Sequence, residues 1–219
     1  MEEKDIYFFP DVTAADENGL LAIGGNLSFG TLINAYKKGI FPWYNPDENI
    51  QWFSPDPRFV LFPDKIKISH SMRNVMNKHL FKFTIDKAFS QVIHNCRITE
   101  RNEEPGSWIS NDIETAYNHL FEKGFAHSAE TWKDNKLVGG LYGVLLGKVF
   151  FGESMFANES NASKFALINW GNILQKNGIE LIDCQVYTPH LESLGAEFIT
   201  RNDFTLLLKK WIPEESMNG

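Results

Sequence analysis

Two carboxylates stand inside runs of residues that are otherwise mostly apolar or small. Glu153 lies in Phe-Phe-Gly-Glu-Ser-Met-Phe, residues 150–156, and Asp183 lies in Ile-Glu-Leu-Ile-Asp-Cys-Gln-Val, residues 179–186. Both patterns predict strands, and a carboxylate is expensive to bury in such a setting unless another group pairs with it. The chain must therefore fold so that partners reach both acids, and two such acids indicate a functional site.

Alternation along the second strand predicts which side chains share a face. Asp183 and Gln185 point one way with Tyr187, and Ile182 and Cys184 point the other way. A carboxylate beside an amide can fix the orientation of that amide, so that its dipole faces a substrate carbonyl. The alternative is that Asp183 caps the following turn or pairs with a buried donor, and the pattern alone favours this structural role.

Three roles are open to Glu153 from its neighbours: it can bind a cation, act as a base, or accept hydrogen bonds from backbone amides. The segment from Gly152 to Phe156 lacks the final glycine of the G-x-S-x-G nucleophile elbow. Ser154 is therefore a poor candidate for an acyl-enzyme nucleophile.

The size and composition predict one globular domain, or one domain with a small companion. The chain has 219 residues, of which 43% are hydrophobic and 22% charged. No apolar run reaches the roughly 20 residues that cross a membrane, and the acidic start Met-Glu-Glu-Lys-Asp is unlike a signal peptide. Cys96 and Cys184 are the only cysteines, which favours a reducing cytoplasm over a disulfide framework.

Charge is unevenly distributed. The net charge is −7, which argues against general nucleic-acid affinity. The segment from Leu61 to Arg97 is nevertheless basic, because only Asp64 and Asp86 oppose its cations. These cations are Lys65, Lys67, Arg73, Lys78, Lys82, Lys87 and Arg97. The segment is either an ordinary solvated surface or a patch that binds an RNA backbone.

The order of expected elements predicts an α+β fold. Ser28 should cap a helix that ends at Gly39, and the proline-rich residues 41–58 should form an ordered loop. A capping box is expected at Asn111, and Ser160 should cap a further helix. Strands are expected at 59–62, 81–85, 127–133, 137–146, 149–151, 180–187 and 197–200, and helices at 69–78, 87–96, 111–123, 160–178, 188 onward and 203–211.

The chain offers no motif for a metal or for a bound nucleotide cofactor. Its histidines show no H-x-x-x-H pattern, and there is no Walker loop or Rossmann glycine fingerprint. We expect no cofactor and no metal, so an enzyme of this sequence would need an already activated substrate. Several aromatic residues are candidates either for stacking on nucleic-acid bases or for the core: Tyr36, Phe41, Trp43, Trp52, Trp108 and Tyr117.

Eight motifs, taken in order and spacing, resemble the bacterial leucyl/phenylalanyl-tRNA–protein transferase family over about residues 6–211. They are Asn-Gly-Leu-Leu-Ala-Ile-Gly-Gly-Asn-Leu-Ser (18–28), Ala-Tyr-Lys-Lys-Gly-Ile-Phe-Pro-Trp (35–43), Trp-Phe-Ser-Pro-Asp-Pro-Arg (52–58), Trp-Ile (108–109), Ala-His-Ser-Ala-Glu (126–130), Val-Gly-Gly-Leu-Tyr-Gly (138–143), Phe-Gly-Glu-Ser-Met-Phe (151–156) and Leu-Ile-Asp-Cys-Gln-Val (181–186).

The resemblance implies a small N-terminal α/β domain, residues 1–60, and an acetyltransferase-like (GNAT) catalytic domain, residues 61–219. It implies transfer of leucine or phenylalanine, and also methionine, from aminoacyl-tRNA to the α-amino group of proteins with N-terminal Arg or Lys. Such a product carries an N-degron. We expect a monomer in the cytoplasm, with no membrane partner.

The resemblance also assigns residues. It implies that Asp183 polarises Gln185, that Gln185 contacts the reacting groups, and that Glu153 helps to place the acceptor amine. Whether the protein or the tRNA's own hydroxyl moves the proton stays open. The implied pocket for the transferred side chain consists of Leu141, Phe150, Met155, Leu167, Trp170 and Ile182. The residues implied to handle the terminal adenosine or substrate are Trp43, Trp108, Tyr36 and Tyr117.

The basic segment departs from the family pattern, because His70, Asn74 and Asn77 interrupt the cluster that contains Arg73 and Lys78. The tRNA body is then expected either to bind more weakly or to bind nearer Lys65, Lys67 and Lys82. Two alternatives remain. An acetyl-CoA-dependent N-acetyltransferase would need a pyrophosphate-binding loop that residues 152–164 do not match, and a non-catalytic tRNA- or N-degron-binding protein would not need Glu153, Asp183 and Gln185.

Overall fold

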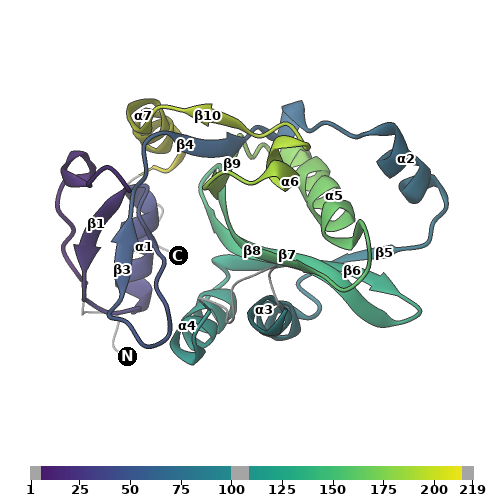
Figure 1. Ribbon diagram of the computed structural model, residues 1–219, viewed down its shortest axis with the longest axis horizontal. Helices are drawn as coiled ribbons and strands as arrows, with labels where there is room; N and C mark the ends of the chain where they lie inside the picture. The colour runs from purple at the N-terminus through teal and green to yellow at the C-terminus, as the bar shows by residue number, and fades with distance from the viewer. Residues whose placement is uncertain (1–5, 100–108, 214–219) are drawn as a thin grey trace.

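The computed structural model describes residues 6–99 and 109–213, which form two sheets with flanking helices (Figure 1). The strands are β1 Leu20–Ile23, β2 Phe41–Pro42, β3 Gln51–Phe53, β4 Arg58–Leu61, β5 Lys82–Ile85, β6 Ala126–Lys133, β7 Lys136–Leu146, β8 Val149–Ala157, β9 Leu181–Gln185 and β10 Glu197–Ile199. The helices are α1 Phe29–Lys37, α2 His70–Asn77, α3 Phe89–Ile98, α4 Asn111–Glu122, α5 Ala162–Lys176, α6 Pro189–Glu192 and α7 Arg201–Trp211, with 3-10 turns at Val12–Ala14 and Pro63–Lys65.

The larger sheet has the strand order β10-β4-β9-β8-β7-β6-β5. Neighbouring strands in this sheet pair antiparallel, except for β8 and β9. These two strands are parallel and are joined in the chain through α5. Helices α3 and α4 lie on one side of this sheet, and α5 and α6 lie on the other (Figure 1). The mixed sheet flanked by helices confirms the predicted α+β class.

The parallel pair opens the sheet where the site forms. Strands β8 and β9 pair at Val149 with Leu181, at Phe150 with Ile182 and at Phe151 with Asp183. The pairing between these two strands ends at the last of these positions. Beyond that point β8 continues to Ala157, whereas β9 turns away at Gln185, whose φ is 63°. The divergence leaves backbone and side chains of both strands facing a common space.

A smaller antiparallel sheet, in the order β1-β3-β2, lies beside α1. The chain's last helix, α7, returns to this region. Its Phe204 and Leu208 belong to the same buried cluster as Tyr36, Ile40 and Trp52. The N-terminal segments and the C-terminal helix are thus held together by one apolar core. The domain boundary expected at residue 60 stays a prediction; β4, which begins at Arg58, belongs to the larger sheet.

Local signals explain most element ends. Ser28 caps α1, because its hydroxyl accepts a hydrogen bond from the backbone N–H of Thr31, as predicted. The β6–β7 hairpin turns at Asp134 and Asn135, whose φ values of 49° and 61° match the type I′ turn that suits a two-residue hairpin. Thr188 caps α6, with Pro189 as its first residue.

Four local predictions were wrong. The loop expected at residues 41–58 contains β2 and β3, and Pro42 is tolerated in β2 because β2 is an edge strand of its sheet. The strand expected to end at Phe151 runs on to Ala157. Ser110, rather than Asn111, caps α4 through the backbone N–H of Ile113. Asn161, in the left-handed conformation, precedes α5 in place of Ser160. The four residues of β1 were not predicted as a strand.

Gly143 is required by close packing between β7 and β8. A Cβ added there would lie 2.1 Å from the carbonyl oxygen of Phe151, whereas one added at Gly152 would lie 3.4 Å from its nearest neighbour, the carbonyl oxygen of Asp183. Gly143→Ala should therefore lower the free energy of unfolding by about 1–3 kcal/mol. Gly152→Ala, the matched control, should stay within about 0.5 kcal/mol of wild type. Equal losses in denaturant unfolding would contradict this packing.

Candidate active site

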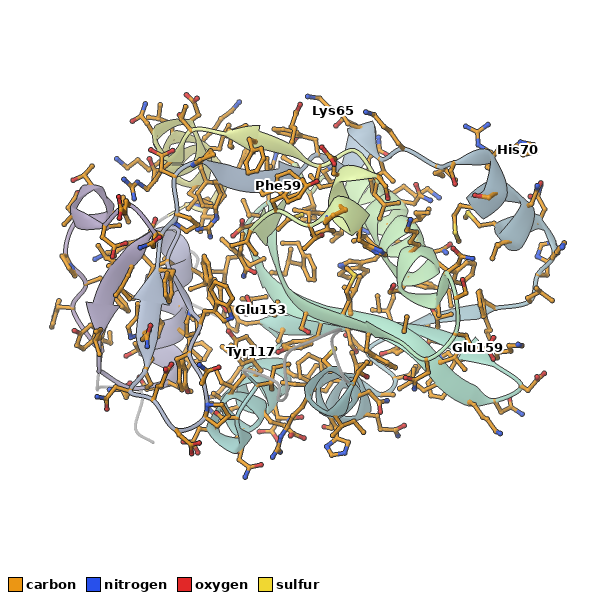
Figure 2. All side chains as sticks on the ribbon, viewed as in Figure 1. Phe59, Lys65, His70, Tyr117, Glu153 and Glu159 are labelled. Carbon is orange, nitrogen blue, oxygen red and sulfur yellow. The ribbon has the colours of Figure 1, made fainter. Side chains whose placement is uncertain are left out.

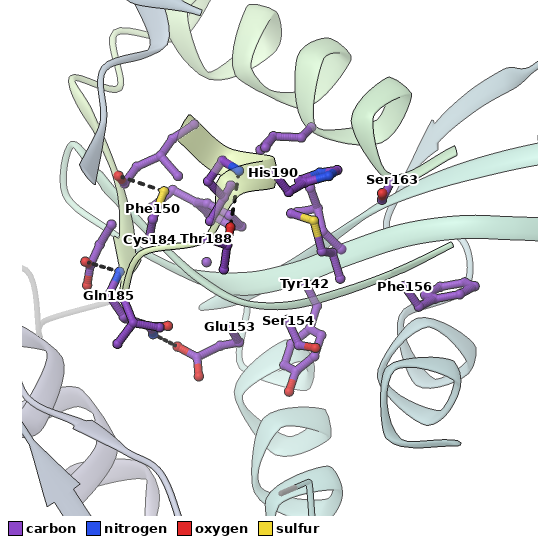
Figure 3. Close-up of a pocket in the computed structure, with 18 of the residues that line it drawn as sticks. Tyr142, Phe150, Glu153, Ser154, Phe156, Ser163, Cys184, Gln185, Thr188 and His190 are labelled. Atoms are coloured by element: carbon purple, nitrogen blue, oxygen red, sulfur yellow. Dashed lines mark hydrogen bonds between the residues drawn. The ribbon is translucent and has the colours of Figure 1, made fainter. Parts of the chain in front are cut away.

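A largely apolar cavity of about 390 Å³ occupies the space between the diverging strands and helices α5 and α6 (Figure 3). That size falls within the range of small-molecule sites. Glu153 and Gln185 lie at one side of it, and Ser163 lies at the other. Its lining is Thr99, Leu141, Tyr142, Phe150, Gly152, Glu153, Ser154, Met155, Phe156, Ala157, Ser163, Leu167, Ile182, Asp183, Cys184, Gln185, Val186, Thr188, His190 and Leu191.

The cavity collects most of the residues predicted for a side-chain pocket. Its lining includes Leu141, Phe150, Met155, Leu167 and Ile182. Trp170 is placed differently: it is absent from the lining and packs edge-on against Phe150, with ring centroids 5.4 Å apart. The bulky indole therefore supports the pocket wall from behind.

Glu153 is buried in a hydrogen-bond network contributed by three distant segments. The hydroxyl of Tyr36, from α1, donates to Oε1 at 2.7 Å, and that of Tyr117, from α4, donates to Oε2 at 2.9 Å. The side-chain Nε2 of Gln185 donates to Oε1 at 3.1 Å. Figure 2 shows Tyr117 and Glu153 facing each other at the centre of the molecule. The packing of α1 and α4 thus sets the position of this carboxylate.

Burial raises the pKa of Glu153 to about 7, although the hydrogen bonds from Tyr36, Tyr117 and Gln185 oppose that rise. Burial, together with the neighbouring carboxylate of Glu153, raises the pKa of both tyrosines well above the ordinary value. The two hydroxyls, which also contact each other, therefore remain protonated donors. Near neutral pH the carboxyl group of Glu153 is poised to exchange a proton.

Of the two roles left open for Tyr36 and Tyr117, base stacking or the core, the structure shows the core. Both side chains have no exposed surface, because their rings lie in the core between the small sheet, α4 and β8. Only the hydroxyl groups act at the site. These residues therefore hold Glu153 and do not present a ring to a base.

Asp183 is held by Arg58, a residue that the sequence did not single out. The guanidinium donates from Nε to Oδ1 at 2.8 Å and from Nη2 to Oδ2 at 2.7 Å, and both side chains are 1% exposed. The same guanidinium donates from Nη1 to the carbonyl of Gly39 at 3.1 Å. It lies between the rings of Phe41 and Phe204, 4.7 and 4.5 Å from their centroids. In the sequence Arg58 was only the last residue of the 52–58 motif, a charge directly before an apolar strand, with no role assigned to it.

The expected hydrogen bond between the Asp183 carboxylate and the side-chain amide of Gln185 does not form between these two described residues. Asp183 Oδ1 instead accepts a hydrogen bond from the backbone N–H of Gln185 at 3.0 Å. This contact stabilises the turn in which Gln185 adopts its positive φ. The turn directs the Gln185 side chain toward Glu153. Asp183 therefore acts on Gln185 through the backbone, and the structural role left open from the sequence is the one observed.

Other predicted residues lie outside this network. Trp43 is 44% exposed and packs against Phe53, whereas Trp108 lies outside the described residues. Arg73 and Lys78 are exposed in and just after α2, at the end of the molecule where Figure 2 marks His70. Lys65 forms a surface ion pair with Glu197 at 2.8 Å, and Lys67 is exposed. Contact of these cations with tRNA stays a prediction.

His190 is a further cavity residue that sequence analysis missed. Its Nε2 is buried and has no hydrogen-bond partner within the described part of the chain. Burial lowers its pKa, so the ring is neutral near pH 7. The Thr188-Pro189 helix start, which was predicted, is the signal that could have placed His190 beside the strand end.

Among the described residues, no cluster of His, Cys, Asp and Glu is arranged to hold a metal ion. No helix of the described segments has both the length and the apolar character needed to cross a membrane. The site therefore consists of a buried carboxyl group with protonated donors around it, open to an apolar cavity.

Two protein-family models together match most of the chain. Residues 60–209 match the leucyl/phenylalanyl-tRNA protein transferase model, and residues 25–56 match the model of that transferase's N-terminal domain. The chain belongs to the leucyl/phenylalanyl-tRNA protein transferase family, which consists of aminoacyltransferases that use aminoacyl-tRNA and protein substrates. This confirms the family inferred from the eight motifs.

Individual proteins with similar sequences belong to the same family. The leucyl/phenylalanyl-tRNA–protein transferase of Syntrophus aciditrophicus is 52% identical over 214 residues, covering 98% of this chain and 90% of the relative. The leucyl/phenylalanyl-tRNA–protein transferase of Flavobacterium johnsoniae is 53% identical over 206 residues, covering 94% of this chain and 97% of the relative. Among solved structures, a GCN5-related N-acetyltransferase from Kribbella flavida has a TM-score of 0.37 at 9% identity, covering 74% of this chain and 57% of that one. The structural similarity is too low to support a conclusion.

Removing one partner of the Arg58–Asp183 pair should leave a buried charge uncompensated. Arg58→Met and Asp183→Leu should each lower the free energy of unfolding by about 3–5 kcal/mol. The double variant should lose less than either single variant, because it buries no charge. A double-mutant cycle by denaturant unfolding measures this coupling, and additive losses would show that the pair is not the stabilising unit.

The raised pKa of Glu153 should make stability depend on pH. The folded protein keeps this proton up to about pH 7, whereas the unfolded chain releases it near 4.5. Wild-type stability should therefore fall by about 2.5 kcal/mol, relative to Glu153→Gln, as the pH rises from 5 to 8. Urea unfolding of both proteins at several pH values measures the difference. A difference that does not change with pH would rule out the shifted pKa.

Proposed function

We propose that this protein transfers leucine or phenylalanine, and also methionine, from aminoacyl-tRNA to the α-amino group of proteins that begin with Arg or Lys. The product would carry an N-degron, and the reaction would take place in the cytoplasm with the protein acting as a monomer. The observation that carries the proposal is the direct opening of an apolar cavity onto the Glu153–Gln185 pair. Membership of the transferase family supports it independently.

The cavity suits the side chain of the transferred amino acid. Leu141, Phe150 and Ile182 offer it an apolar wall, and Met155 and Leu167 add flexible surface. An unbranched or γ-branched apolar side chain would fill this space. Selection against valine or isoleucine by shape would be worth only about 1–3 kcal/mol for each methylene difference. The ester carbonyl of the aminoacyl group would then lie near Gln185.

The reaction needs little from the protein beyond positioning and proton transfer. The acceptor's α-nitrogen attacks the ester carbonyl, an amide bond forms, and the bond to the tRNA ribose oxygen breaks. The amine proton must leave, and the ribose oxygen must gain one. An α-amine with an unperturbed pKa of about 7.7–8.0 already has a neutral fraction near pH 7. The aminoacyl ester is itself activated, so the scheme requires no ATP.

Glu153 has the properties to orient and deprotonate that amine. Its pKa of about 7 makes it a carboxylate in part of the population at neutral pH, near the ideal for a general base. Gln185 would bind the carbonyl or the amine, and Arg58 and Asp183 would keep the turn that aims Gln185. The tRNA hydroxyl remains the natural acceptor of the final proton, since it is the leaving group.

The tRNA would extend away from this centre. We propose that Trp43, together with Trp108, handles the terminal adenosine. The backbone of the tRNA body would contact the exposed cations Lys65, Lys67, Arg73 and Lys78. Such contacts are electrostatic and should weaken as salt increases.

A transfer assay tests the proposal. Purified protein is mixed with leucyl-tRNA and with peptides that differ only in a first residue of Arg or Met. Leucine should appear only on the Arg peptide. Glu153→Gln should reduce the rate about 100-fold, as expected for loss of a general base. Glu159→Gln makes the same chemical change on an exposed loop, where Glu159 pairs with Lys133, and should keep the wild-type rate. Absence of transfer by wild type would refute the function.

A further inference from the structure

An exposed cluster of aromatic rings lies beside the cavity, and the proposed reaction does not yet use it. Tyr187 and Phe198 are 45% and 52% exposed. Their rings are stacked, with centroids 5.9 Å apart and an interplanar angle of 19°, and both rest on the buried ring of Phe59. We call Tyr187 and Phe198 the aromatic platform. Large rings held in place at the surface offer their faces to a partner.

A carboxylate stands at the edge of the aromatic platform. The hydroxyl of Tyr187 donates to Oε2 of Glu192 at 2.8 Å, and this bond raises the pKa of Tyr187. Within the described chain, Glu192 forms no ion pair. The neighbouring Glu197, by contrast, is neutralised by Lys65. The platform therefore combines aromatic faces with one uncompensated negative charge.

The platform is continuous with the site. Val186 and Thr188, the two neighbours of Tyr187 in the chain, both line the cavity. Gln185 is only two residues before Tyr187, so their Cα atoms are separated by at most about 7 Å. An extended Arg or Lys side chain spans a similar length. A residue whose α-amine lay at Glu153 and Gln185 could therefore extend its side chain onto the platform.

We propose that the aromatic platform and Glu192 bind the cationic side chain of the acceptor's first residue. This inference rests on the proposed function and specifies how its acceptor is selected. A guanidinium or ammonium group lies favourably over an aromatic face, and a carboxylate at the ring edge completes the contact by a charge-assisted hydrogen bond. A neutral first residue gains neither contact.

A nucleotide of the tRNA end is the other partner that stacks on aromatic rings. The charge of the surface favours the cation, because an unpaired Glu192 repels a phosphate backbone and attracts Arg or Lys.

Steady-state transfer with saturating leucyl-tRNA tests the assignment. The acceptors are two peptides that differ only in their first residue, Arg or its uncharged analogue citrulline. For the Arg peptide, Glu192→Gln should raise KM about three-fold and Tyr187→Leu about three-fold to ten-fold, with kcat unchanged. For the citrulline peptide, Glu192→Gln should leave KM at the wild-type value.

Glu197→Gln is the matched control, because its carboxylate is on the same surface but already paired with Lys65. It should leave the KM for both peptides unchanged. A wild-type KM for the Arg peptide in Glu192→Gln would overturn the inference while the proposed function stands. A raised KM for leucyl-tRNA, with that for the peptide unchanged, would assign the platform to RNA instead. Failure of the wild-type protein to transfer leucine to any peptide would refute the proposed function itself.

Discussion

The buried ion pair between Arg58 and Asp183 is the interaction on which the site depends. Its guanidinium joins three parts of the chain: the Gly39 carbonyl and Phe41 ring of the N-terminal region, strand β9, and Phe204 of the C-terminal helix. Two buried charges offset their desolvation only when geometry and hydrogen bonding are complete, and here both carboxylate oxygens are matched. The pair therefore ties the association of these elements to the position of Asp183.

A short series of hydrogen bonds links Asp183 to the groups that we propose take part in the reaction. Its carboxylate accepts a hydrogen bond from the backbone N–H of Gln185, the turn directs the amide side chain to Glu153, and the hydroxyls of Tyr36 and Tyr117 also hold Glu153. Every member of this network is buried, so its hydrogen bonds are not exchanged for water. The result is a carboxyl group with a pKa of about 7 at one side of an apolar cavity, which fits aminoacyl transfer to an amine.

The sequence was informative where local patterns decide structure. Apolar alternation identified β9 and the start of β8, and the two acids within them marked the centre of the site. Partners distant in sequence were beyond such patterns. Nothing local shows that Arg58 reaches Asp183 across 125 positions, or that Tyr36 and Tyr117 meet at Glu153. Their rings were left open between base stacking and the core, because composition alone cannot distinguish a buried tyrosine from an exposed one. The short strands β2 and β3 were not predicted, because the prolines around them indicated a loop.

The Arg58–Asp183 pair holds Gln185 and Glu153 at one side of the cavity that we propose receives the transferred side chain. The decisive measurement is a crystal structure with a leucyl group linked by a stable amide to 3′-amino-adenosine. The account predicts the leucyl side chain between Phe150 and Leu167, with its carbonyl facing Gln185 and Glu153. A leucyl group bound elsewhere, or a cavity filled by the adenosine, would contradict it.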